Sequence, residues 1–122
     1  MVELIEADDV RLLVELGFIA LSAGLNQESE RIFAGVTAAR PDAEAGFLGQ
    51  ALVQIARNDL DEAISTLRAL PPSDAAMTYL GLALARVGDR NEAQRVFKLV
   101  VETAPSTPFA ALAAAGLKTL EG

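Results

Sequence analysis

The side chains of this sequence that could carry out chemistry are carboxylates, hydroxyls and two lysines, because the chain contains neither histidine nor cysteine. A serine or threonine nucleophile needs a neighbouring base, and the usual one, histidine, is absent. Without cysteine the chain can form no thiolate metal site and no disulfide. The glycines stand singly along the chain and form no phosphate-binding loop. We therefore assign no catalytic residue and expect a protein without enzyme activity.

Two acidic clusters could in principle bind a metal ion. The first, Glu3, Glu6, Asp8 and Asp9, lies ahead of or within the first turn of an expected helix, where carboxylates favour the helix dipole. The second, within residues 58–62, resembles part of a calcium loop but lacks the glycine and the distal glutamate that such a loop needs. Helix capping accounts for both clusters, so we expect no metal site and no cofactor.

The composition indicates a cytoplasmic protein that binds neither nucleic acid nor a membrane. The formal net charge of -7 opposes binding to phosphates or to an anionic membrane surface. No apolar run is long enough to span a bilayer. The acidic first residues lack the basic region and apolar run of a signal peptide. A length of 122 residues predicts a single domain.

The chain repeats one pattern, in which a small residue stands one helical turn before a large apolar residue. The pairs are Ser29 and Phe33, Ala63 and Leu67, and Ala93 and Phe97. The small residues recur at intervals of about 30 to 34 positions, and helical periodicity with such a repeat is typical of a helical repeat array. We expect helices over about 10–23, 26–39, 43–57, 60–70, 75–87, 91–103 and 107–121.

Local signals mark the ends of these helices. Gly24 and Gly88 are expected to end helices. Asn26 and Thr107 are expected to cap the helices that follow them, with Pro108 at the first helical position. Asp59 and Asp89 are each followed by a glutamate three residues later, which predicts a capping box at both sites.

This pattern resembles the tetratricopeptide repeat. Repeat one (10–43) and repeat three (74–107) match it closely, whereas repeat two (44–73) is four residues short and weaker. The matching residues are Leu13, Leu16, Gly17, Ala20, Gly24, Ser29, Phe33, Val36 and Pro41 in repeat one, Phe47, Gln50, Ala51, Gln54, Ala63, Leu67 and Leu70 in repeat two, and Met77, Leu80, Gly81, Leu84, Gly88, Ala93, Phe97, Val100 and Pro105 in repeat three. The resemblance implies an all-α, right-handed superhelix of three helix pairs over residues 1–122, closed by a capping helix at about 107–121.

In this family the first helices of successive repeats line a concave groove. The positions that correspond here are Val14, Phe18, Leu21, Leu48, Leu52, Ile55, Thr78 and Leu82, with Arg86 beside them. The resemblance therefore implies an apolar groove for a partner segment, most naturally an amphipathic helix. The other interpretation is that these residues are core, covered by the chain's own termini or by a second copy in a homodimer. A carboxylate-binding groove is not expected, since only Arg11 and Arg86 could serve it.

A small acidic protein with three such repeats and an apolar groove is similar to the tetratricopeptide chaperones of bacterial type III secretion. Those proteins hold an aggregation-prone subunit until it is exported. The alternative is a generic scaffold or self-associating repeat domain without a chaperone role.

Overall fold

The computed structural model of the chain describes residues 7–121, with side chains from Val10 onward. Within that range the chain forms seven α-helices and no strand. The helices belong to two compact units, which divide between Asp59 and Leu60. Glu3 and Glu6, expected ahead of the first helix, lie outside the described residues. None of the described helices is both long enough and apolar enough to cross a membrane.

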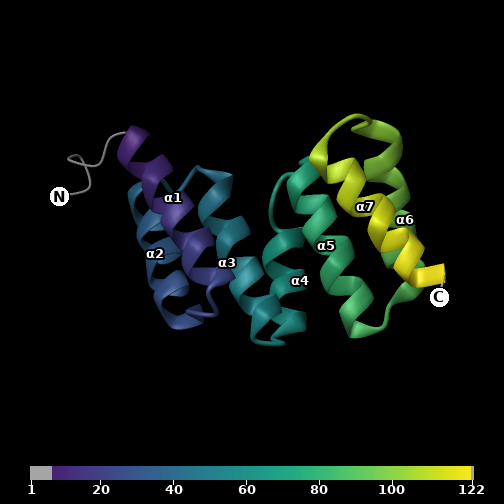
Figure 1. The fold of residues 1–122 in the computed structure, drawn as a ribbon, viewed down its shortest axis with the longest axis horizontal. Coiled ribbons are helices and arrows are strands. Elements are labelled where there is room, and N and C mark those ends of the chain that lie inside the picture. Colours follow the sequence, from purple (N-terminus) through teal and green to yellow (C-terminus); the bar gives the residue numbers. More distant parts are fainter. Residues whose placement is uncertain (1–6, 122) are drawn as a thin grey trace. The chain divides into compact units, whose positions relative to one another are not determined.

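Unit 1 contains α1 (Ala7–Ser22), α2 (Asn26–Ala39) and α3 (Glu44–Ala56), and each of these helices packs against the other two (Figure 1). Gly24 ends α1 as predicted, in the left-handed conformation at φ +80°, which glycine adopts without steric cost. The Ser29 hydroxyl donates a hydrogen bond of 2.9 Å to the carbonyl oxygen of Gly17. The small residues at these two positions thus let α1 and α2 approach closely.

The predicted cap at Asn26 is wrong. Asn26 is the first residue of α2, and Leu25 occupies the cap position without a side-chain hydrogen bond. The tight turn after α1 is the reason, because the Leu25 amide already bonds back to the carbonyl of Ala20 and the Leu25 carbonyl accepts from Ser29. The backbone of the turn therefore starts the helix one residue earlier than the side-chain signal indicated.

Unit 2 contains α4 (Leu60–Arg68), α5 (Asp74–Val87), α6 (Arg90–Thr103) and α7 (Pro108–Glu121). Helix α5 packs against α4, α6 and α7, and α6 also packs against α7 (Figure 1). Two predicted caps are confirmed: the Asp89 carboxylate accepts from the amide of Glu92, and the Thr107 hydroxyl accepts from the amide of Ala110. The capping box at Asp89 is only half formed, because the Glu92 side chain bonds to Arg95 instead. Helix α4 ends at Arg68, two residues before the expected end.

The two units share one packing device, a phenylalanine ring between two glycines of different helices. The Phe33 ring of α2 lies against Gly17 of α1 and Gly49 of α3, and neither glycine has room there for a Cβ atom. The Phe97 ring of α6 lies in the same way between Gly81 of α5 and Gly116 of α7. The large residues of the repeated pattern, Phe33, Leu67 and Phe97, are all buried, with exposed fractions of 0%, 2% and 3%. Helix α7 therefore packs against repeat three in the same way as α3 packs against repeat one.

Equivalent positions of repeats one and three differ in burial. Leu16 and Leu80 occupy the same position of the repeat pattern, but Leu16 is 43% exposed and Leu80 only 7%. In unit 2 the face that carries Leu80 is covered by α4, because Leu67 of α4 and Leu80 line the same small cavity. In unit 1 the helices α2 and α3 cover other faces of α1. The same position of the repeat pattern is therefore buried in one unit and partly exposed in the other.

Candidate functional site

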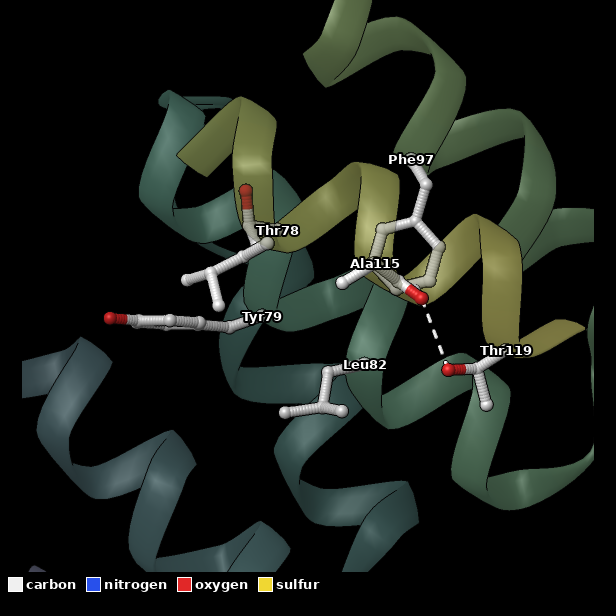
Figure 2. A pocket seen from close by; sticks show the side chains of 8 residues that line it. Thr78, Tyr79, Leu82, Phe97, Ala115 and Thr119 are labelled. Atoms are coloured by element: carbon white, nitrogen blue, oxygen red, sulfur yellow. Dashed lines mark hydrogen bonds between the residues drawn. The ribbon is translucent and has the colours of Figure 1, made fainter. Parts of the chain in front are cut away.

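A groove runs between α5 and α7 in unit 2. It consists of two adjoining cavities of about 270 Å³ and 410 Å³, which share Leu82, Phe97, Gly116 and Thr119 in their linings. The first cavity is also lined by Thr78, Tyr79, Leu112 and Ala115, and the second by Ala85, Arg86, Arg90 and Leu120. Figure 2 shows the Phe97 ring between the two helices that form the walls. We call this surface the α5–α7 groove.

The two threonine hydroxyl groups that line the groove are bonded to their own helices. Thr119 donates to the carbonyl oxygen of Ala115 at 3.0 Å, the bond drawn in Figure 2. Thr78 donates to the carbonyl oxygen of Asp74 at 2.7 Å. Tyr79 packs its ring edge-on against Phe109, with centroids 6.4 Å apart. Because the threonine donors are already used, the groove offers a ligand mainly methyl groups and rings.

Two arginines mark one end of the groove. Arg90 donates to the carbonyl oxygen of Leu120, near the C-terminal end of α7, which fixes its side chain against the groove wall. Arg86, on the last turn of α5, is exposed and forms no ion pair within the described chain. A carboxylate bound at this end would therefore meet a guanidinium that is free to pair with it.

The structure brings the three predicted partner-binding residues of repeat three together in this groove. Thr78 lines the first cavity, Arg86 the second, and Leu82 both. Thr78 is buried, with 4% of its surface exposed, whereas Leu82 is half-buried and Arg86 exposed. Sequence reasoning missed the second wall, formed by Leu112, Ala115 and Gly116 of α7. Leu112 of this wall is 55% exposed.

One sequence signal could have revealed this second wall. Gly49 and Gly116 each stand in the helix that follows the one bearing the ring they contact, at a similar distance along the sequence from Phe33 and Phe97. This shared placement identifies α7 as the counterpart of α3, which is a first helix of a repeat. A first helix is expected to line the groove rather than only to cover the end of the core.

The other six predicted residues lie on α1 and α3 of unit 1. Val14, Phe18 and Leu21 of α1 and Leu52 of α3 are half-buried. Leu48 and Ile55 of α3 are buried, with exposed fractions of 8% and 4%. Phe18 packs edge-on against Phe33, with ring centroids 4.9 Å apart. Of these six residues, the half-buried four present some apolar surface, whereas Leu48 and Ile55 belong to the core.

The charged side chains of unit 2 form one clear interaction outside the groove. Arg95 donates to the Glu92 carboxylate at 3.0 Å from its Nε, and this hydrogen bond lowers the pKa of Glu92 below its ordinary value and raises the pKa of Arg95. Both residues border a cavity of about 330 Å³ that also contains Arg68 and Leu67. Within the described part of the chain, no three acidic residues converge in a way that could hold a metal ion.

Comparisons with known proteins identify the fold. The Yersinia enterocolitica type III secretion translocator chaperone SycD superimposes with a TM-score of 0.81 at 20% identity, covering 98% of this chain and 92% of SycD. SycD in complex with a peptide of the translocator YopD gives 0.75 at 18% identity, covering 96% and 95%. A tetratricopeptide repeat protein from Parabacteroides merdae gives 0.67 at 18% identity, covering 96% of this chain and 47% of that protein. The chain has a tetratricopeptide-repeat fold.

This tetratricopeptide-repeat fold is the one predicted from the repeat pattern, and it is shared with type III secretion translocator chaperones. No protein-family model matches the sequence, and neither does any curated protein. At such low sequence identities the likeness establishes the fold, while the function depends on the site itself.

Proposed function

We propose that this protein is a cytoplasmic, non-enzymatic chaperone that holds an apolar or amphipathic helical segment of another protein. The observation that carries the proposal is the α5–α7 groove, whose lining is apolar and whose threonine hydroxyls are bonded to their own helices. Exposed apolar patches on soluble proteins commonly mark interaction sites. An amphipathic helix fits such a groove by placing apolar side chains from successive turns into it. The shared fold with SycD, which has been crystallised with a translocator peptide, supports this proposal.

The side chains have distinct roles in the proposed complex. Leu82 and Leu112 form opposite walls of the α5–α7 groove and contact the apolar face of the bound segment. Phe97 forms its floor, and Arg86 pairs with a carboxylate at one end of the segment. Unit 1 by itself offers a separate apolar surface, made by the half-buried side chains Val14, Phe18, Leu21 and Leu52. By analogy with the chaperones of the same fold, we infer that the partner is a translocator-type subunit of a secretion system.

The alternative function is a scaffold or self-associating repeat domain without a chaperone role. A chaperone and a scaffold differ in the effect of binding on the solubility of the ligand. A chaperone keeps an aggregation-prone segment in solution, so light scattering from such a segment falls when the protein is added. A scaffold binds a partner that is already soluble. Genes for secretion components beside the gene of this protein would favour the chaperone.

Binding of a synthetic amphipathic peptide to matched variants tests the proposal. The probe is a fluorescent peptide of about five helical turns, with leucines on one face and glutamines on the other, titrated by anisotropy. Leu112→Asp places a charge in the groove at an exposed position and should weaken binding at least about tenfold, equivalent to about 1.4 kcal/mol. Leu99→Asp is the control, because Leu99 is 40% exposed on α6 and does not line the groove.

The result that would overturn the proposal is equal binding by Leu112→Asp, Leu99→Asp and the unchanged protein. Leu82→Asp on the opposite wall provides a second measurement, and circular dichroism verifies that each variant is folded. Leu52→Asp tests the contribution of unit 1 in the same assay. A translocator peptide serves as the second probe and tests the narrower inference about the partner.

A further inference from the structure

The cavity of about 330 Å³ in unit 2 lies on the side of α5 that faces away from the α5–α7 groove. Ala76, Met77 and Leu80 of α5 line it. In an α-helix these positions lie about 180° around the axis from Thr78 and Leu82, which line the groove. The cavity and the groove are therefore separate sites. We call this one the α4–α6 cavity, because residues of those two helices form its walls.

The cavity lies where α4 and α6 leave a gap over α5. Among the described residues of unit 2, these two helices each pack against α5 but not against each other. Helix α4 has 9 residues, whereas α6 has 14, and the segment after α4 closes one end of the cavity with Leu70 and Pro72. Pro71 and Pro72 restrict the backbone of this segment, and the Ser73 hydroxyl accepts a hydrogen bond of 3.1 Å from the amide of Ala76. The cavity is therefore preformed, and a ligand need not order it on binding.

The floor of the α4–α6 cavity is apolar. Leu67, Ala76 and Leu80 are buried residues that line it, and Met77 is half-buried. A methionine side chain adapts to the shape of its neighbour and makes favourable contact with aromatic rings. The volume of the cavity is at the lower limit of the range for small-molecule sites. It therefore suits one large apolar side chain better than a whole ligand.

Two arginines stand at the rim above this apolar floor. Arg95 of α6 is bonded to Glu92, whereas Arg68 at the end of α4 is exposed and forms no hydrogen bond or ion pair within the described chain. The pKa of Glu92 is lowered mainly by the hydrogen bond from Arg95 and further by the charge of Arg68, so Arg68 acts on a carboxylate at this rim. Two guanidinium groups and one carboxylate leave one positive charge without a partner, in a chain whose net charge is -7. This rim and floor are complementary to a carboxylate beside an apolar group.

We propose that the α4–α6 cavity is a second peptide-binding site, which takes a short segment of another protein with one large apolar residue next to an aspartate or glutamate. The apolar side chain enters the cavity over Met77, and the carboxylate pairs with Arg68 at the rim. An exposed ion pair adds little affinity by itself, so the apolar side chain is the anchor and the carboxylate selects the segment. This proposal does not depend on the proposed function, because a segment bound here leaves the α5–α7 groove free.

The NMR signal of the Met77 methyl group tests this site directly. The chain has two methionines, Met1 and Met77, so isotope labelling of methionine methyl groups gives one signal from the cavity. The probe is a short unstructured peptide with a single phenylalanine between two aspartates, and its addition should shift the Met77 signal until the site is saturated. A matched peptide with asparagines in place of the aspartates should bind about fivefold more weakly. This difference should shrink at high salt, and equal binding of the two peptides at low salt would refute the role of the rim.

Two charge reversals in the full chain identify where the peptide binds. Arg68→Glu changes an exposed side chain at the rim and should weaken binding of the aspartate peptide at least about tenfold. Arg86→Glu makes the same change beside the α5–α7 groove and should leave this binding unaltered. A Met77 signal that does not move, or equal binding by Arg68→Glu and the unchanged protein, overturns the proposal. Weaker binding by Arg86→Glu alone would place the peptide in the α5–α7 groove and overturn it as well.

A free acid distinguishes a peptide site from a small-molecule site. Phenylpropionate carries a ring and a carboxylate without a peptide backbone, and it should shift the Met77 signal only at much higher concentration than the aspartate peptide. If it acts at the same concentration, the α4–α6 cavity takes small acids and the proposed peptide segment is wrong. Circular dichroism verifies that Arg68→Glu is folded, and the comparison of the two peptides on the unchanged protein decides the matter if it is not.

Discussion

The glycine–phenylalanine–glycine contact in unit 1 gives the sharpest prediction for stability. A Cβ atom at Gly49 would lie 2.1 Å from Cδ1 and 2.2 Å from Cε1 of Phe33. Carbon atoms make favourable contact at about 3.5–4.0 Å, so the overlap is more than about 1 Å. The ring cannot move away into solvent, because Phe33 is fully buried, and on its other side a Cβ at Gly17 would be only 2.7 Å from it. Gly49→Ala therefore forces the helices apart.

The expected magnitude follows from two opposing effects. Replacing glycine by alanine inside a helix is worth about 1 kcal/mol in helix propensity. Overpacking a filled core costs about 1–3 kcal/mol, and the large overlap at Gly49 places it at the upper end. Gly49→Ala should therefore lower the free energy of unfolding by about 2 kcal/mol. Gly35→Ala is the matched control in α2, since nothing lies within 4 Å of a Cβ at Gly35, and it should raise that free energy by up to about 1 kcal/mol.

Native-state amide hydrogen exchange of α2 and α3 measures these changes within unit 1. The double variant with Phe33→Leu supplies the decisive comparison. If the overlap with the ring causes the loss, Gly49→Ala should cost at least about 1 kcal/mol less in the Phe33→Leu background, as expected for residues in direct contact. A stabilising Gly49→Ala, or equal costs in both backgrounds, would refute the packing explanation.

Two further predictions concern unit 2. Phe97→Ala removes a ring that is only 3% exposed and should lower the free energy of unfolding by about 3–5 kcal/mol in urea titration; a loss below about 1 kcal/mol would mean that the ring does not hold the repeat together. Arg95→Gln should raise the pKa of Glu92 toward its ordinary value in a carboxyl NMR titration, because the hydrogen bond from Arg95 is the main cause of the lowered pKa. The ion pair stabilises the fold above the unfolded pKa of Glu92 and ceases to do so as the pH falls through the lowered folded pKa. A pKa of Glu92 that does not respond to Arg95→Gln would contradict the assignment of the lowered pKa to Arg95.

The sequence predicted those parts of the fold that depend on local chemistry. Helix ends at Gly24 and Gly88, and caps at Asp89 and Thr107, follow from the conformations and hydrogen bonds of single residues. The buried rings follow from a small residue one turn before a large one. The cap at Asn26 was wrong because backbone hydrogen bonds in the preceding turn decided where the helix starts.

Burial was harder to predict, because it depends on which neighbouring helix covers a face. Leu16 and Leu80 have the same place in the repeat pattern, yet only Leu80 has a helix against it within its unit. The α5–α7 groove was predicted from one wall alone for the same reason. Leu112 is compatible with either face of α7 until the contact between Gly116 and Phe97 fixes the rotation of that helix. The apolar pattern of α7 alone does not show this contact, and only the placement of Gly116 relative to Phe97, which matches that of Gly49 relative to Phe33, points to it.

The position of Phe97 has a consequence for how this protein can diverge. The same ring forms the floor of the α5–α7 groove and fills the space between Gly81 and Gly116. A substitution there that changes the shape of the groove also loosens the repeat, so selection for a new partner is opposed by selection for a folded chain. Leu112 and Arg86 at the rim are exposed, so substitutions there change the groove without loosening the packing of the repeat. Homologues that differ in partner should therefore vary at the rim while they keep an aromatic floor between two glycines.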